Sequence, residues 1–462
     1  MSAGHMRNPK LLVSVFNAQE AREAIAGGGR IIDSEDPRSA LGNIKPRQIM
    51  AISDAVLNYK RDFDVQLSTN IGEDQLLFDR SARGIAIQKS PYEIAGKAAQ
   101  AAIGVSCAMG TQVHPCNWVK VGVDGMEVEL VTQVLSEVVH TLKRTEQYRH
   151  CQVMSVLFAQ DMGHWNTRKS HPSVREVLVG LREFYQVDSK DPDGFDLKDY
   201  AVGTLRDDSN RPYFAKKEEV TLEVLVQLGI LGEGSKSSFV RLNELFPHSQ
   251  FFPGIEEGQG KTTQAVIKAM VDATAEAGAD GIMLDTRIQS KVARICLVDT
   301  SSEGLIDLNP YDKSNGLSRQ GILSLEDLKF FVDYCHFKGV IANIAGSVQS
   351  YQAQQLWVQI PDADHLSTRG GSSAVPFDPS IGKDAGTNTR QFRVIKRSLV
   401  RGLAPPEHGG VLNIPKKIND DKQARERMHE LIAGLSQKRQ EMGLPKLESF
   451  LVESYGNQER IE

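Results

Sequence analysis

The chain has 462 residues, enough for one large domain with insertions or for two to three domains. Its composition, 40% hydrophobic and 24% charged, is ordinary for a soluble globular protein. The net charge of -5 does not indicate a general binder of nucleic acid or of membranes. No apolar segment reaches the roughly 18 residues that a bilayer span requires. We therefore expect neither nucleic acid nor a membrane as a partner.

The cysteines give no sign of a disulfide framework or of a zinc site. They are odd in number, scattered along the chain and without a CxxC pair. A reducing cytoplasm is the simplest location for such a chain, and we expect no cofactor and no bound metal. The five positions are Cys107, Cys116, Cys151, Cys296 and Cys335.

Strand-like and helical segments alternate along the chain. It opens with a compact apolar strand at 11–16, a helix rich in alanine and glutamate at 18–26 that ends at three glycines, and a second strand at 31–33. Six more strand-like segments follow, at 65–71, 118–123, 153–158, 281–284, 340–345 and 365–368. Amphipathic helical patterns lie between most of them, at 94–103, 127–142, 263–276 and 325–336. Eight strands that alternate with helices predict a parallel (β/α)8 barrel.

The interval between the fifth and sixth strands exceeds a hundred residues, far more than one helix with its loops requires. We therefore predict an inserted module at 163–250, with helices at 174–184 and 220–228 followed by a hairpin that ends in a strand at 238–242. This order fits a small winged-helix-like module. It holds 12 Lys/Arg against 14 Asp/Glu, so contact with a protein, or a lid, is favoured over DNA binding.

The predicted domain organisation is a barrel in two parts, at 7–162 and 251–403, which flank the inserted module at 163–250. A C-terminal extension at 404–462 follows, with a Pro/Gly-rich start and a charged helical stretch at 420–441. We expect this extension to pack on the barrel or on a second subunit, and we expect a homo-oligomer.

Lys120 stands alone in the middle of an apolar strand, Asn117-Trp118-Val119-Lys120-Val121-Gly122-Val123. A buried ammonium group is costly unless it is paired or used, although a lysine at an exposed strand end would be unremarkable. Other predicted strands also end in polar side chains, among them Asp33, Asn70 and Asp285. Because the carboxyl ends of the strands build the active site of such a barrel, we predict that these side chains meet there.

Lysine beside carboxylates supports two kinds of chemistry on a carbonyl substrate. When deprotonated, Lys120 can form an imine (a Schiff base), and when charged it can stabilise a developing enolate. Asp33 and Asp285 are then candidate acid/base groups or partners of the ammonium, and the alternative is a set of structural salt bridges. His114 and Cys116 precede the same strand and belong to the opposite end of the barrel, so they are weak candidates for a nucleophile and its base.

A magnesium ion is a further possibility for a carboxylate cluster, which would comprise Asp33, Glu35, Asp36 and Asp285. Carboxylates on loops are more often solvated or paired with lysine, so we predict no metal.

The ends of the last two strands have the composition of a phosphate site. Gly346 and Ser347 follow the seventh strand, and Arg369, Gly370 and Gly371 follow the eighth. Glycines allow close approach of backbone N–H groups, and serine and arginine donate further hydrogen bonds. Phosphate sites in barrels commonly use these two loops, although Gly-Ser sequences also occur in ordinary turns. We predict that a small phosphorylated molecule binds here, with Asn70 as a further contact.

A second phosphate motif fails on spacing. Gly258-Gln259-Gly260-Lys261-Thr262-Thr263 resembles a P-loop, and a strand that ends in aspartate follows it. The P-loop requires a glycine at the position of Ile255, whereas the nearest glycine is Gly254. We therefore do not predict a nucleotide site.

Taken together, these segments resemble the (5-formylfuran-3-yl)methyl phosphate synthase family, or 4-HFC-P synthase, barrel enzymes that condense two triose phosphates into a furan. The resemblance covers the predicted barrel, with strand five matching loosely, but neither the insertion nor the extension. It rests on five ordered segments, LLVSVFNAQEAREAIAGGGRIID from Leu11, WVKVGVDG from Trp118, GADGIMLDT from Gly278, GVIANIAGSV from Gly339 and STRGG from Ser367.

The resemblance implies active-site roles for Asp33, Lys120 and Asp285. It also implies phosphate-binding loops that comprise Gly346, Ser347, Arg369 and Gly370. Two family lysines are replaced. The imine-forming lysine of the family lies two residues after the second-strand aspartate, where this chain has Glu35, and a further lysine corresponds to Gln289. Glutamate cannot form an imine, so Lys120 remains as imine former or enolate stabiliser, and Glu35 is an added candidate base.

The expected function is that of a lyase or synthase acting on a triose phosphate or a similar phosphorylated carbonyl compound, by aldol-type condensation with dehydration. One alternative is a different lyase or isomerase reaction on a phosphorylated small molecule. Another is a non-catalytic barrel that binds a phosphorylated metabolite.

Overall fold

The computed structural model describes most of the barrel and of the C-terminal extension. The described residues are 8–37, 41, 44–71, 78–80, 86–88, 90–109, 116–123, 128–159, 201–206, 212–215, 263–286, 296–298, 305–306, 308, 321–346, 348–374, 393–416, 418, 422–452 and 457–461.

Eight parallel strands form a closed barrel in the order β1-β14-β13-β10-β7-β6-β3-β2. The predicted (β/α)8 barrel is thus confirmed, with all eight strands where the alternation placed them. Closure comes from the pairing of the first strand with the last, Lys10 to Val13 against His365 to Thr368. The strands are β1 (Lys10–Val15), β2 (Ile31–Ser34), β3 (Gln66–Asn70), β6 (Cys116–Gly122), β7 (Gln152–Phe158), β10 (Gly281–Asp285), β13 (Ile341–Ile344) and β14 (His365–Thr368).

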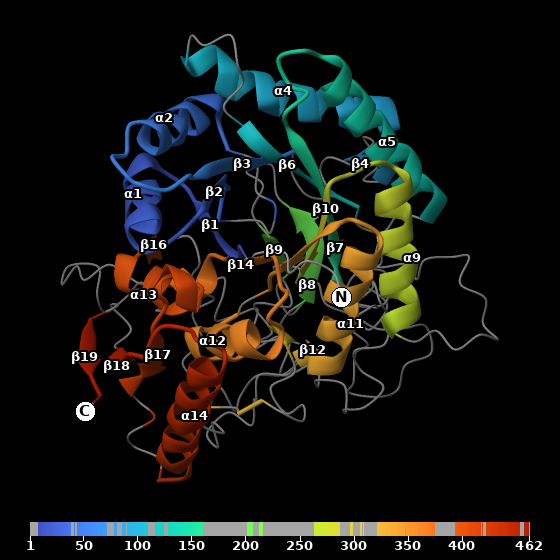
Figure 1. The fold of residues 1–462 in the computed structure, drawn as a ribbon. Helices are drawn as coiled ribbons and strands as arrows, with labels where there is room; N and C mark the ends of the chain where they lie inside the picture. The colour runs from blue at the N-terminus through green and yellow to red at the C-terminus, as the bar shows by residue number, and fades with distance from the viewer. Residues whose placement is uncertain are drawn as a thin grey trace.

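Helices surround the barrel, as Figure 1 shows. All but α13, which follows the last barrel strand, connect one strand to the next, as a right-handed parallel crossover requires. Their ends carry the expected signals: Asn17 caps the first helix through Glu20 N, and Ser324 forms a capping box with Asp327. The helices are α1 (Ala18–Ala26), α2 (Pro46–Leu57), α4 (Pro91–Met109), α5 (Val128–Arg144), α9 (Thr263–Glu276), α11 (Leu325–Phe337), α12 (Ser350–Gln359) and α13 (Arg397–Leu403).

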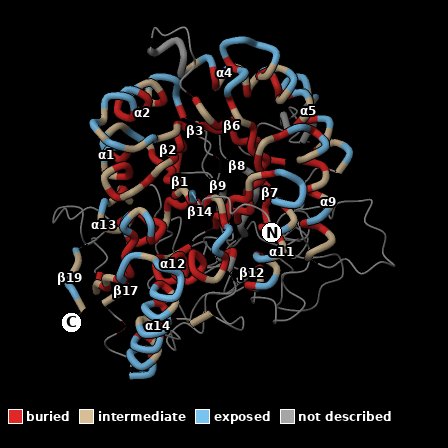
Figure 2. Tube along the Cα trace, viewed as in Figure 1, coloured by how far each residue is buried: buried red, intermediate tan, exposed pale blue. Residues whose placement is uncertain are grey.

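The strands are buried on both faces, which explains their nearly continuous apolar sequences (Figure 2). Alternate residues of each strand point to opposite faces, so two hydrophobic clusters form. The larger cluster lies between strands and helices and includes Leu11, Val13 and Ile32. The smaller one fills the barrel and includes Leu12 and Ile31. Polar residues that continue the inward-facing series are therefore enclosed by the barrel.

Several short strands lie outside the barrel and were not predicted. Within the predicted inserted module, the structure describes only an antiparallel pair, β8 (Ala201–Arg206) and β9 (Pro212–Ala215). The helices and the hairpin predicted for this module lie outside the described residues. The other pairs are β4 (Phe78–Arg80) with β5 (Ala86–Gln88), β11 (Cys296–Val298) with β12 (Gly321–Leu323), and β15 (Ser373–Ala374) with β16 (Val394–Ile395).

The C-terminal extension packs on the barrel through α12. The predicted charged helix is α14 (Lys422–Glu441), and its apolar residues form a cluster with Tyr351 and Val358 of α12. Its Arg439 is buried and donates to Gln354 Oε1 at 2.6 Å and to Gly410 O at 3.0 Å. A sheet that was not predicted completes the extension, with β17 (Leu412–Pro415), β18 (Ser449–Val452) and β19 (Gln458–Arg460), after a short 3-10 turn at Pro406–His408.

Among the helices of the described residues, none is long and apolar enough to cross a membrane.

Candidate active site

Lys120 lies inside the barrel and is only 1% exposed. It belongs to β6, where its backbone is in register with Asn70 of β3 and Met154 of β7. Its neighbours Val119 and Val121 face the helices as part of the larger cluster, so the alternation of the strand directs Lys120 inward. The prediction that this strand carries a buried lysine is therefore confirmed.

Two carboxylates of β2 and its following loop bind the ammonium group. Lys120 Nζ lies 2.7 Å from Asp33 Oδ2 and 3.3 Å from Glu35 Oε2. Asp33 is fully buried and Glu35 is 2% exposed. One cation thus faces two buried anions, an arrangement whose desolvation cost only close pairing and further hydrogen bonds can offset.

Two serines on neighbouring strands provide those further hydrogen bonds. Ser14 Oγ lies 3.1 Å from Asp33 Oδ2 and 3.0 Å from Glu35 Oε2, and Ser68 Oγ donates to Asp33 Oδ1 at 2.7 Å. The register explains this contact, because Asp33 is paired in the sheet with Ser14 on one side and Ser68 on the other. Asp33 is thereby fixed through both carboxylate oxygens.

The pKa of Lys120 is raised above its ordinary value of 10.5. Burial is the largest influence and by itself lowers the pKa. The charges of Asp33 and Glu35, the hydrogen bond to Asp33 and the charge of Asp285 outweigh it together. The lysine is therefore a stably charged ammonium at neutral pH, suited to stabilising negative charge and poorly suited to attacking a carbonyl.

Two other predicted residues lie close to this cluster. Asp285, the last residue of β10, is 6% exposed, accepts a hydrogen bond from Thr286 N at 2.7 Å and acts electrostatically on Lys120. Asn70, the last residue of β3, is 1% exposed, and its Nδ2 donates to Ser34 O at 3.2 Å. The structure thus brings Asp33, Glu35, Asp285 and Asn70 to the same end of the barrel as Lys120.

The predicted phosphate loops are closely packed at two glycines and open at a third. Gly346 has φ +92°, and a Cβ there would lie 2.9 Å from Leu297 Cβ. A Cβ on Gly371 would collide with Val348 O, while one on Gly370 would meet none of the described residues within 4 Å. Gly370 therefore presents its backbone to open space, as a phosphate contact requires. Ser347, Gln289 and Lys291 lie outside the described residues.

Two threonine hydroxyls beside these loops were not predicted. Thr286 Oγ1 and Thr368 Oγ1 are buried and make no hydrogen bond to the described part of the chain. They lie next to the loop glycines, because a Cβ on Gly346 would be 3.1 Å from Thr286 Oγ1 and one on Gly371 would be 3.3 Å from Thr368 Oγ1. Such donors are expected to bind a ligand, since buried polar groups are normally paired.

Arg369 binds the protein itself. Its Nη1 lies 3.1 Å from Glu20 Oε2 and 3.0 Å from Ser14 O, and its Nη2 lies 3.3 Å from Glu20 Oε1. Arg369 and Glu20 are both buried, so this is an internal ion pair that fixes the start of α1 against the last loop. Both terminal nitrogens of the predicted phosphate fork are thus engaged, and phosphate binding by Arg369 stays a prediction. Nearby Arg393 bonds to Ser373 Oγ at 3.2 Å, and thus also holds this loop.

Within the residues that the structure describes, no three His, Cys, Asp or Glu side chains are placed to hold a metal ion. Of the four carboxylates considered for magnesium, Asp33 and Glu35 bind the Lys120 ammonium and Asp285 acts on it electrostatically. Cys116 is buried, and burial is the largest of the influences that raise the pKa of its thiol well above the ordinary value. Cys116 is the first residue of β6, at the end of the strand away from Asp33 and Asp285, and its thiol contacts Trp118 O. His114 lies outside the described residues.

Comparison with known proteins agrees with this geometry. The family model of 4-HFC-P synthase matches residues 11–179, so the resemblance to that family is confirmed over this part of the chain. No match was found among curated proteins.

Solved structures resemble the chain only at a coarse level. Thiamine phosphate pyrophosphorylase from Pyrococcus furiosus is 10% identical with a TM-score of 0.31, over 85% of this chain and 96% of that one. N-(5'-phosphoribosyl)anthranilate isomerase from Pyrococcus furiosus is 8% identical with a TM-score of 0.33, over 86% and 96% of the two chains. At these scores the likeness carries no argument about function.

Proposed function

Because residues 11–179 match the 4-HFC-P synthase family, we propose that this barrel is a biosynthetic lyase or synthase acting on a triose phosphate or a similar phosphorylated carbonyl compound. The reaction would be an aldol-type carbon–carbon bond formation followed by dehydration. The observation that supports it most directly is the buried ammonium of Lys120 between Asp33 and Glu35.

The first step would be enolisation. Glu35 would take a proton from the carbon next to the substrate carbonyl, and the charge that develops on the carbonyl oxygen would be stabilised by the Lys120 ammonium. Ser68, Ser14 and Lys120 together engage both oxygens of Asp33. Its role would be to orient the lysine and keep it charged.

Bond formation and loss of water would follow. The enolate carbon attacks the aldehyde of a second substrate molecule, and the resulting alkoxide takes a proton. Elimination then removes a second proton from the carbon next to the remaining carbonyl and expels water, with Asp285 as the candidate that takes this proton and passes it to the leaving hydroxyl. The raised pKa of Lys120 supports this enolate route over an imine route.

The phosphate would bind at the loops after β13 and β14. The backbone at Gly346, Ser347, Gly370 and Gly371 and the hydroxyls of Thr286 and Thr368 would donate hydrogen bonds, and Asn70 would contact the remainder of the substrate. Arg369 would contribute through its position in the loop and its positive charge.

The test is exchange of the carbon-bound protons of dihydroxyacetone phosphate in D2O, followed by proton NMR. We expect exchange with the wild type and its loss in Glu35→Gln and Lys120→Met. Lys143→Met, at a half-exposed lysine paired with Asp280, is the matched control and should retain exchange. A contaminating isomerase would give exchange in all four preparations, including Glu35→Gln and Lys120→Met, and is recognised in this way.

Borohydride trapping with intact-protein mass spectrometry separates the two routes. The enolate route predicts no adduct with dihydroxyacetone phosphate or glyceraldehyde 3-phosphate. An adduct that disappears in Lys120→Met would establish the imine route instead. Substrate binding without exchange, adduct or product would contradict the proposed catalysis and favour a barrel that only binds a phosphorylated metabolite.

A further inference from the structure

A cavity that is partly open to solvent lies at the opposite end of the barrel from Lys120. It has a volume of about 380 Å³ and is lined by the end of α1, the residues before β2, α13, the turn at Pro406–His408 and β19. Arg30, which lines it, immediately precedes β2, whereas Asp33 and Glu35 lie at the end of β2 and beyond. The cavity is therefore separate from the candidate active site.

Three arginines contribute to the wall of this cavity, Arg30, Arg397 and Arg401. Arg30 lies with its guanidinium carbon 3.4 Å from the centre of the Phe63 ring, which holds the side chain in place. Its Nη1 is buried and has no hydrogen-bond partner among the described residues. Because this donor is already removed from water, the hydrogen bond and charge attraction that an anion forms with it can exceed the hydration that the anion loses.

His408 adds a further buried donor or acceptor. It lines the same cavity, and its Nδ1 also lacks a hydrogen-bond partner within the described part of the chain. Burial, and the charges of Arg30 and Lys10, lower its pKa to about 4, so the imidazole is neutral at pH 7. A neutral imidazole can donate to an anion without adding another buried positive charge.

The negative charges nearby leave the cavity itself cationic. None of the described residues that line it is acidic. Glu448 binds Arg401 Nη2 at 3.0 Å, Glu23 accepts from the backbone N–H of Arg397 at 3.3 Å, and Asp62 acts electrostatically on Arg30, yet none of these carboxylates belongs to the wall. Arg401 also donates from Nε to Gly409 O at 3.2 Å, so the buried Nη1 of Arg30 is the main donor left for an anion.

We infer that this cavity is a binding site for a small phosphorylated metabolite. Guanidinium groups match the oxygens of a phosphate in a bidentate fork, which favours phosphate over a singly charged carboxylate. The volume lies at the lower end of the range of small-molecule sites and exceeds the space that a phosphate ion alone requires. The inference does not depend on the proposed reaction, because it uses different residues at the other end of the barrel.

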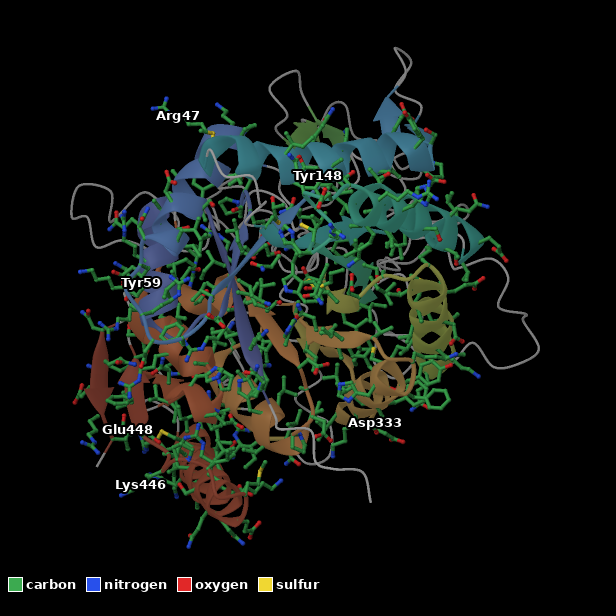
Figure 3. All side chains as sticks on the ribbon, turned by 45° about the horizontal axis from the view of Figure 1, so that its top comes forward. Arg47, Tyr59, Tyr148, Asp333, Lys446 and Glu448 are labelled. Carbon is green, nitrogen blue, oxygen red and sulfur yellow. The ribbon has the colours of Figure 1, made fainter. Side chains whose placement is uncertain are left out.

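The site can be located directly by chemical protection. Phenylglyoxal modifies accessible arginines, and both Arg397 and Arg401 are exposed. We expect glycerol 3-phosphate to reduce modification of both at least several-fold, as read by peptide mass spectrometry on the full chain. Arg47, an exposed arginine of α2 far from Glu448 in Figure 3, should be modified equally with and without ligand. Equal modification of Arg397 and Arg401 in both conditions would overturn the inference.

Inorganic phosphate distinguishes the ligand. If the cavity recognises the organic part as well, glycerol 3-phosphate should protect at a concentration at least tenfold lower than inorganic phosphate. Equal protection by the two would overturn the assignment to a phosphorylated metabolite and leave a site for the free ion.

Variants provide an independent measurement by calorimetric titration with glycerol 3-phosphate. Arg397→Gln, at an exposed position, should weaken binding to the cavity at least tenfold and leave binding at the catalytic loops unchanged. Arg47→Gln serves as the control and should leave every binding event unchanged. Unaltered titration of Arg397→Gln would contradict the inference, and the melting temperature of each variant verifies that it is folded.

Discussion

At Lys120, two buried carboxylates depend on one cation. We expect Lys120→Met to lower the free energy of unfolding by roughly 3–5 kcal/mol, because Asp33 and Glu35 would then face one another without a counter-charge. Urea denaturation measures this loss. Lys143→Met, which removes a half-exposed pair with Asp280, should cost at most about 1 kcal/mol.

A double variant tests the electrostatic explanation. Adding Glu35→Gln to Lys120→Met removes one of the two opposed charges, so it should restore part of the lost stability. If the double variant is no more stable than Lys120→Met alone, the cost comes from lost packing and the two carboxylates do not destabilise one another.

His365 introduces a dependence of stability on pH. It is buried at the start of β14, with its ring edge-on to Trp118 at a centroid distance of 5.6 Å. Burial, followed by the charge of Lys10, lowers its pKa from 6.5 to about 3. Between pH 6.5 and about 3, the unfolded chain therefore binds a proton at His365 that the folded chain does not. The free energy of unfolding is thus unaffected by His365 above pH 6.5 and decreases as the pH falls toward about 3.

Removal of this group should make the free energy of unfolding less dependent on pH in the acid range. In His365→Gln, the free energy of unfolding should fall by about 1 kcal/mol less per pH unit between pH 6 and 4, as measured by urea titration at each pH. Identical slopes in both proteins would show that His365 is protonated in the folded state.

The sequence predicted these residues unevenly. Lys120 was identifiable because an isolated charge in an apolar strand demands a partner, and Asp33 because it ends a strand that must point the same way. Ser14 and Ser68 gave no such signal, since a serine in a strand is compatible with either face. The pairing of Arg369 with Glu20 was also missed, because it joins residues far apart in the chain and a glutamate in the first turn of a helix already has a local role.

Among the elements, α1 depends on one side chain of its first turn, Glu20, for contacts with three other parts of the fold. Glu20 accepts hydrogen bonds from Arg369, from Phe16 N at 2.7 Å and from Ile395 N at 3.3 Å. It therefore joins the helix to β1, to the loop after β14 and to β16.

Substitution of Glu20 by Gln would leave Arg369 buried beside a neutral amide. We expect a loss of about 3 kcal/mol or more in the free energy of unfolding, measured by urea denaturation. Glu146→Gln, at an exposed pair with Arg149, is the control and should change it by less than about 1 kcal/mol. A loss of similar size in both variants would contradict the role assigned to Glu20.

Element boundaries followed from sequence where local patterns decide them. The helix predicted at 263–276 coincides with α9, and those at 127–142 and 325–336 differ from α5 and α11 by one or two residues at their ends. Strand β17 was missed because it pairs with β18, more than thirty residues away, and a short segment without alternation does not reveal such a partner.

At the scale of the whole molecule, the extension and the barrel meet at Gly402. A Cβ there would collide with the amide of Asn413 and lie 2.7 Å from Ser350 Oγ. Ser350 Oγ in turn binds Gly402 O at 2.8 Å and Asn413 N at 2.9 Å, so α12, α13 and β17 share one small space.

Gly402→Ala should therefore destabilise the protein by about 1–3 kcal/mol through overpacking, seen as a lower melting temperature. Gly434 of α14 is the matched control. A Cβ on it would meet no atom of the described part of the chain within 4 Å, so Gly434→Ala should raise stability by about 0.5–1 kcal/mol. A stabilising Gly402→Ala would mean that this junction is loosely packed.

The pairing of β1 with β14 has a consequence for the order in which the protein can be made. Arg369 and Ser14, which are in contact, are 355 positions apart. A ribosome must therefore release most of the chain before the first strand acquires its second neighbour. Until then the nascent sheet has two open edges, which invite pairing with other chains. Expression at low temperature or with chaperones should increase the soluble yield more than it would for a protein of local contacts.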